Sequence, residues 1–92
     1  MIQSFADKDT ERFFLTERSI SLPADIQKRA YQRLALIHSA RELRDLRMPP
    51  GNRLEALSGN RAGQHSIRIN NQWRVCFRWN DGAHDVEITD YH

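Results

Sequence analysis

The chain has 92 residues, a formal net charge of +2 and a single cysteine. A chain of this length builds only one modest core, so we expect a single domain over residues 1–92. The absence of any run of about 18 apolar residues excludes a membrane-spanning helix, and one cysteine excludes an internal disulfide. There is no Cys/His spacing typical of zinc sites and no apolar segment typical of a signal peptide, so we expect a cytoplasmic protein.

Positive charge is concentrated in the middle of the chain. Residues 41–78 carry eight arginines, no lysine and three acidic residues, whereas residues 81–92 carry four acidic residues and no Lys or Arg. Arginine presents a planar fork of donors that suits phosphate groups. The central block therefore fits a polyanionic partner, nucleic acid above all, and equally a solvated surface in an arginine-rich proteome.

The N-terminal half predicts an extended segment followed by two helices. Residues 1–5 indicate a short strand, and residues 11–15 a short helix capped by Asp9 or Thr10. The second helix is expected from about residue 23 to about residue 40, with Ser21 as its cap and Pro23 in its first turn. Its apolar stripe consists of Ile26, Ala30, Leu34 and Ile37. Two prolines and a glycine at 49–51 exclude a continuing helix.

The C-terminal half alternates between apolar and polar residues, which indicates strands. We expect strands near residues 54–57, 67–69, 73–79 and 86–91, with a hairpin turn at Asn80-Asp81-Gly82. The predicted fold class is α+β. An N-terminal strand and two helices pack on one face of an antiparallel sheet of about four to five strands, and the other face is open.

Side-chain alternation predicts which face each arginine occupies. In the strand over 73–79 the odd positions are apolar, which puts Trp73 and Trp79 in the core and the even positions on the open face. The open face is thus expected to carry Arg68, Arg74, Arg78 and Tyr91. Asp90 and His92 have the opposite parity but lie where a strand end frays.

Several segments resemble one protein family. They are the stretch Gly51 to Gly63, which ends in the pattern Leu-X-Gly-X-Arg-X-Gly, the segment 66–70 with Trp73-Arg74, and the terminal Asp90-Tyr91-His92. Together they resemble HigB-type toxins of the RelE/ParE superfamily, the toxins of bacterial toxin–antitoxin pairs, over nearly the whole chain.

The resemblance implies a small RelE-like fold and a ribosome-dependent endoribonuclease. Such toxins cut mRNA in the ribosomal A site without a metal ion or other cofactor. The implied partners are the 70S ribosome with its mRNA and a HigA-type antitoxin with a helix-turn-helix domain. Toxin and antitoxin together bind the operator DNA of their own promoter, so contact with that DNA is indirect, and no membrane is involved.

The resemblance also assigns roles to individual residues. Arg74 matches the catalytic arginine and Tyr91 the residue that stacks on or orients the nucleotide. Asp90 and His92 are the remaining members of the implied catalytic group, where they move or hold protons. The expected contacts to RNA phosphates or ribosomal RNA are Arg53, Arg61, Arg68 and Arg78.

Two departures from the family and two other functions stay open. Glu55 and Ser58 stand where certain HigB-type toxins have an active-site histidine and lysine, so the general base is unassigned, and His65 is a further candidate. The first alternative function is a ParE-like gyrase inhibitor, which performs no chemistry. The second is a non-catalytic nucleic-acid-binding module whose arginines only hold phosphates.

Overall fold

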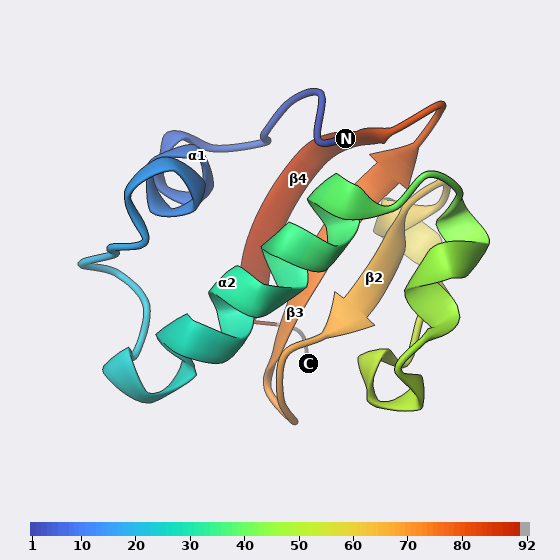
Figure 1. Ribbon diagram of the computed structural model, residues 1–92. Coiled ribbons are helices and arrows are strands. Elements are labelled where there is room, and N and C mark those ends of the chain that lie inside the picture. The colour runs from blue at the N-terminus through green and yellow to red at the C-terminus, as the bar shows by residue number, and fades with distance from the viewer. Residues whose placement is uncertain (91–92) are drawn as a thin grey trace.

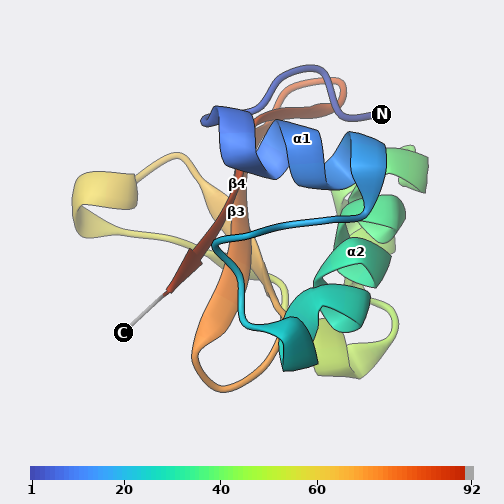
Figure 2. The ribbon, with the colours of Figure 1, turned by 90° about the vertical axis from the view of Figure 1, so that its left-hand side faces the viewer.

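The structure, a computed structural model, describes residues 1–90. Two helices, α1 (Lys8–Thr16) and α2 (Ala24–Ser39), precede an antiparallel sheet with strand order β1-β2-β3-β4. The strands are β1 (Glu55–Ala56), β2 (His65–Arg68), β3 (Trp73–Trp79) and β4 (Ala83–Asp90). Both helices lie on the same side of the sheet (Figures 1 and 2). The predicted α+β architecture is confirmed.

The first residues extend the sheet beyond β4. Ile2 and Phe5 form isolated parallel bridges with Ala83 and Val86. Backbone hydrogen bonds support them, from the Gln3 N–H to the Ala83 carbonyl at 2.7 Å and from the Ala6 N–H to the Val86 carbonyl at 2.9 Å. The expected N-terminal strand is therefore present as two bridges along the β4 edge.

The first helix begins earlier than the sequence pattern indicated. It starts at Lys8, and its N-cap is Asp7, whose Oδ1 accepts a hydrogen bond from the Thr10 N–H at 2.7 Å. The prediction of Asp9 or Thr10 as cap was wrong, because an aspartate just before the helix satisfies one of its free N–H groups. Phe13, which is 1% exposed, anchors α1 in the core.

The second helix forms as predicted and covers the sheet. All four residues of its stripe are buried: Ile26, Ala30, Leu34 and Ile37. They join one core cluster with apolar residues of β2, β3 and β4. Ser21 is not the cap: Pro23 holds that position without a side-chain hydrogen bond.

Short turns of 3-10 helix connect α2 to the sheet, at Leu43–Arg47 (η1) and Pro50–Asn52 (η2). A capping box stabilises η1, since the Asp45 carboxylate accepts from the backbone N–H of Glu42 and the Glu42 side chain accepts from that of Asp45. The Asn52 side chain, 0% exposed, donates to the carbonyls of Leu46 and Met48 at 3.2 Å. These contacts fix the path of the chain into β1.

The β3–β4 hairpin turns at residues 80–82, as predicted. Gly82 has φ +129°, and a Cβ there would lie 2.8 Å from the Met1 carbonyl oxygen, so only glycine fits. A register shift opposite the β3 segment Cys76–Arg78 forms a bulge in β4 at Asp85, whose φ is 53°. Within residues 1–90 no helix is long and apolar enough to cross a membrane.

Candidate active site

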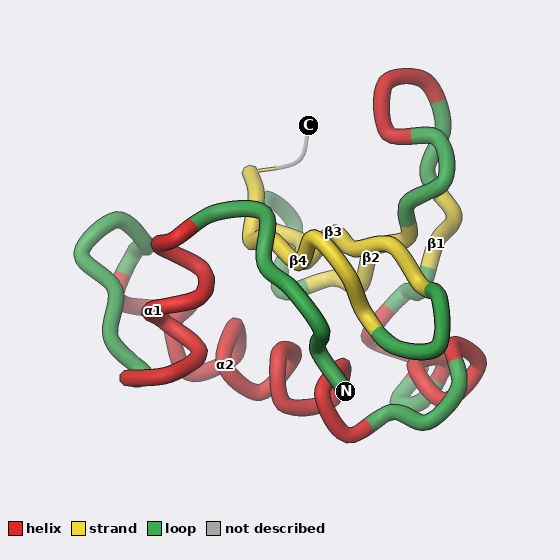
Figure 3. Tube along the Cα trace, turned by 90° about the horizontal axis from the view of Figure 1, so that it is seen from above, coloured by secondary structure: helices red, strands yellow, loops and turns green. Residues whose placement is uncertain are grey.

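One face of the sheet, turned away from the helices, gathers polar and arginine side chains. Ile67, Val75 and Phe77 are 0% exposed on the helix side, so alternation directs their neighbours to the other side. We call this other side the arginine face, and its residues are Ser66, Arg68, Arg74, Cys76, Arg78 and Glu87. The connection between β1 and β2 projects from the same side as the end of β4 (Figure 3).

Arg74 lies on the arginine face but is not open to solvent. Its residue exposure is only 9%, so the expectation of a solvent-open arginine was wrong. Its Nε donates to Ser66 Oγ at 2.7 Å, and its Nη2 donates to the Arg53 carbonyl at 2.7 Å. Glu55 Oε2 lies 3.8 Å from the same Nη2. Strand alternation fixes only the side of the sheet, whereas the chain at residues 53–55 covers that side.

Arg61 reaches across the sheet to β4. Its Nη1 lies 2.6 Å from Glu87 Oε1 and also donates to Gln64 Oε1 at 3.0 Å. The side chains of Arg61 and Glu87 are 30% and 27% exposed, respectively. This contact ties the β1–β2 connection to the opposite edge of the arginine face.

Cys76 is a free thiol that lies between these groups and is 0% exposed. Burial raises its pKa most; the Arg61 charge lowers it, the Glu87 charge raises it and the Arg74 charge lowers it. Because the net shift is upward, the thiol stays protonated at neutral pH and is not a nucleophile.

The remaining predicted phosphate contacts occupy different settings. Arg68 is the cross-strand partner of Arg74, and its side chain bonds Asn71. Arg78 is about half exposed, and its Nε lies 3.6 Å from Asp85 Oδ2. Its Nη1 lies close to Gly63, where an added Cβ would be 3.0 Å away. Arg53, with an exposed side chain and φ 47°, contributes its carbonyl to Arg74.

The C-terminal members of the predicted catalytic group are only partly described. Tyr91 and His92 lie outside the described residues. Asp90 pairs with Trp73 in the β3–β4 register, and its Oδ2 accepts from Gln72 Nε2 at 2.8 Å. Its neighbour Thr89 is the cross-strand partner of Arg74, so the described end of β4 lies directly beside this arginine.

His65 lies on the other side of the sheet. Its ring stacks on Phe77 with centroids 6.4 Å apart, and its Nδ1 is buried without a hydrogen-bond partner among the described residues. Phe77 belongs to the core, so His65 is separated from Arg74 by the sheet. Trp73 and Trp79 are half-buried and pack against this core, in line with the prediction.

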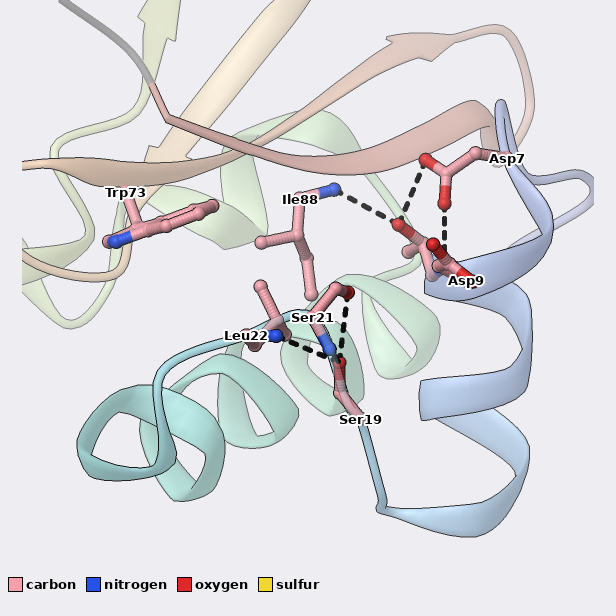
Figure 4. A pocket seen from close by; sticks show the side chains of 8 residues that line it. Asp7, Asp9, Ser19, Ser21, Leu22, Trp73 and Ile88 are labelled. Atoms are coloured by element: carbon pink, nitrogen blue, oxygen red, sulfur yellow. Dashed lines mark hydrogen bonds between the residues drawn. The ribbon is translucent and has the colours of Figure 1, made fainter.

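A pocket of about 290 Å³ between α1 and the ends of β3 and β4 is separate from the arginine face (Figure 4). Trp73, Ile88 and Leu22 form apolar walls, and the other lining residues are aspartates and hydroxyl residues. None of its lining residues is basic, so the pocket does not suit a polyanion. Within residues 1–90 no group of three or more His, Cys, Asp or Glu could hold a metal ion.

The partners of the arginines could not be predicted from the sequence. Ser66 holds Arg74, and Glu87 pairs with Arg61. The parity of Ser66 relative to Arg68 was a usable signal for its side of the sheet. No signal within one strand indicated the pairings, because they depend on the register between strands.

Comparison with known proteins agrees with this architecture. The family model described as RelE-like toxin of type II toxin-antitoxin system HigB matches residues 3–92. Over 84 residues the chain is 41% identical to Toxin HigB-1 of Vibrio cholerae, covering 90% of this chain and 88% of that protein. It is 32% identical over 93 residues to Endoribonuclease HigB of Proteus vulgaris, covering 100% of both chains. An uncharacterized protein of Haemophilus influenzae is 29% identical over 91 residues, or 98% of this chain and 90% of that protein.

The small antiparallel sheet, with helices on one face and arginines on the other, is thus that of a RelE-like toxin of a type II toxin–antitoxin system. Within that class, the chain belongs to the HigB-like toxin family. The resemblance inferred from the sequence is confirmed. As a toxin of a type II toxin–antitoxin system, the protein has an antitoxin as partner.

Proposed function

We propose that this toxin is an endoribonuclease that cuts mRNA in the ribosomal A site and so stops translation. The observation that carries the proposal is Arg74, a nearly buried arginine oriented by Ser66 and Arg53 on a face rich in further arginines. The similarity to a protein named Endoribonuclease HigB, over the whole chain, supports the same reaction.

The proposed reaction is attack of a ribose 2′-oxygen on the adjacent phosphorus. The 2′-hydroxyl loses its proton, the new P–O2′ bond forms, and the P–O5′ bond breaks as the 5′-oxygen takes up a proton. The products are a 2′,3′-cyclic phosphate and a 5′-hydroxyl. Arg74 stabilises the additional negative charge on the phosphorane, and its low exposure strengthens that interaction relative to one in water. The proposal requires no metal ion or other cofactor.

The remaining roles follow from side-chain chemistry. Asp90 and His92 are proposed to handle the two protons, and Tyr91 to stack on the base next to the cut. Contacts to the phosphates of mRNA or ribosomal RNA are proposed for Arg53, Arg61, Arg68 and Arg78. Arg61 and Arg78 are paired with Glu87 and Asp85 in the structure. On binding, RNA phosphates would replace these carboxylates or contact the same guanidinium groups.

The proposed partners follow from the same function. The 70S ribosome supplies the mRNA and helps to set the geometry of the cut, which places the toxin in the cytoplasm. A HigA-type helix-turn-helix antitoxin neutralises it. Through that antitoxin, the complex binds operator DNA and represses its own promoter.

In vitro translation of a defined mRNA tests the proposal. Purified toxin is expected to produce cuts at codons in the A site, mapped by primer extension, with 5′-hydroxyl ends that polynucleotide kinase labels without phosphatase treatment. Cuts should be absent without ribosomes and lost in Arg74→Ala. The matched control is Arg12→Ala, an exposed arginine on α1, which should cut like the wild type.

Other results would overturn the assignment. Intact mRNA together with inhibition of DNA supercoiling would assign the chain to the gyrase inhibitors. Intact mRNA with strong, salt-sensitive binding to naked RNA would assign it to the non-catalytic binding modules.

A further inference from the structure

A group of basic residues on α2 lies at the end of β2. Arg33 Nε donates to the Arg68 carbonyl at 2.9 Å, and Arg29 Nη1 donates to the Ile69 carbonyl at 3.4 Å. Lys28 and Arg29 also line a polar hollow of about 430 Å³ together with Asn70 of the β2–β3 turn. The helix therefore presents three adjacent basic side chains beside the end of the sheet.

These charges are not neutralised within the described part of the chain. No carboxylate of residues 1–90 lies within 4.0 Å of the basic groups of Lys28, Arg29 or Arg33, although Asp25 lines the same hollow. Burial, and then the charge of Arg29, lowers the pKa of Arg33. Like charges held this close repel one another, and a bound polyanion relieves the repulsion.

The group is continuous with the arginine face. The Arg68 carbonyl holds Arg33, while Arg68 itself stands opposite Arg74 in the β2–β3 register. Arg68 likewise has no carboxylate within 4.0 Å among residues 1–90. A basic band thus runs from α2, around the β2–β3 end of the sheet, to Arg74. We define the basic band as Lys28, Arg29, Arg33 and Arg68.

We propose that the basic band binds the sugar–phosphate backbone of RNA that extends beyond the phosphate at Arg74. The proposal rests on the proposed function for its choice of RNA. Arginine and lysine side chains that lack carboxylate partners bind phosphodiesters without reading sequence, so the band adds affinity and orientation. The same chemistry fits the cleaved strand and ribosomal RNA, which the experiment distinguishes.

The test compares two variants with the same change in charge. Lys28→Gln/Arg29→Gln removes two charges of the band, and Lys8→Gln/Arg12→Gln removes one lysine and one arginine from α1, which contributes no residue to the band. All four residues are exposed, so both variants should fold, as far-ultraviolet circular dichroism and thermal unfolding will check. Binding is measured by fluorescence anisotropy to a 20-nucleotide single-stranded RNA, and by co-sedimentation with 70S ribosomes that lack mRNA, between 50 and 300 mM salt.

For the band variant, the slope of log affinity against log salt concentration should become shallower by roughly 0.7 for each lost phosphate contact. The α1 variant should keep the wild-type slope. A change with the single-stranded RNA assigns the band to the cleaved strand, and a change with ribosomes alone assigns it to ribosomal RNA. Equal slopes for both variants in both assays overturn the proposal. A wild-type toxin that binds RNA through the band but cuts no mRNA would contradict the proposed function alone.

Discussion

Ser66 Oγ accepts a hydrogen bond from Arg74 Nε at 2.7 Å, and the two residues are 0% and 9% exposed. The bond runs diagonally between neighbouring strands, because the cross-strand partner of Arg74 is Arg68 and that of Ser66 is Cys76. Together with the Arg53 carbonyl, Ser66 sets the plane of the guanidinium. We regard Ser66 as a positioning residue that acts on RNA through Arg74.

Removing the Ser66 hydroxyl should lower both stability and activity. In Ser66→Ala the Arg74 Nε–H loses its acceptor in a buried setting, which costs about 1–3 kcal/mol of unfolding free energy. Cleavage by the fully folded variant should fall by roughly ten- to a hundredfold, because a catalytic group held loosely spends less time in the reactive geometry. Urea unfolding and ribosome-dependent cleavage measure the two effects separately.

The matched control for this change is Ser39→Ala. Ser39 is exposed near the end of α2, and its hydroxyl donates only to the Leu36 carbonyl of its own helix. Its loss should leave cleavage unchanged. Full cleavage by Ser66→Ala would show that Arg74 needs no help from Ser66.

Arg74→Lys tests whether charge alone is sufficient. Lysine keeps the positive charge, but its single ammonium group lacks the planar fork that serves Ser66 Oγ and the Arg53 carbonyl at once. We expect cleavage to fall nearly as far as in Arg74→Ala, with a loss of about 1–3 kcal/mol in unfolding free energy. Primer extension on translated mRNA gives the cleavage rate. A lysine variant that retains most of the wild-type rate would assign the effect to charge rather than orientation.

Glu87→Gln should make Arg61 more available to RNA, because it removes the charge of the Glu87 carboxylate while the contact of Arg61 with Gln64 stays. The ion pair is partly exposed, so its loss should cost at most about 1 kcal/mol of unfolding free energy. With one carboxylate removed from the arginine face, binding to single-stranded RNA should tighten, and its salt dependence should steepen by roughly 0.7 in slope.

Asp9→Asn is the control for Glu87→Gln. It removes the same charge from α1, where Asp9 lies 3.6 Å from Arg12. Fluorescence anisotropy across a salt series should show no comparable change in this variant. An equal effect of both variants would point to net charge alone and against a local role of Glu87.

Asp45 should make stability depend on acidic pH. Hydrogen bonds from the backbone N–H groups of Glu42 and Arg41 hold the pKa of this carboxyl below its ordinary value. A lowered folded-state pKa means that the stabilisation is present above the ordinary Asp pKa of about 4 and is lost as pH falls through the folded value.

The test of this pH dependence is Asp45→Asn. The variant should be less stable than the wild type at pH 7, and the difference should narrow as pH falls below about 4. Thermal unfolding across that range measures it. A difference for Asp45→Asn that stays constant with pH would contradict the assignment.

Local patterns correctly predicted the helices and strands whose apolar periodicity is contained within a few consecutive residues. The stripe of α2 is a helical repeat, and the alternation of β3 is a property of one strand, so both were correct. The turn before β4 followed from Gly82, whose backbone conformation other residues rarely adopt. The predicted start of α1 was wrong because several polar residues in that segment can cap a helix, and only the structure shows that Asp7 is the cap.

The features of the candidate site also separate into those that local sequence patterns predict and those that depend on contacts distant in sequence. The sequence by itself determined that Arg68, Arg74 and Arg78 share one side of the sheet, because alternation follows from the pleat of each strand. Only the tertiary structure decided that Arg74 is nearly buried and that Arg61 is paired. Those outcomes depend on contacts between residues 21 positions apart, for Arg53 and Arg74, and 26 apart, for Arg61 and Glu87. No periodicity within one element encodes such contacts, since they arise when the chain on either side of β1 folds over its neighbours.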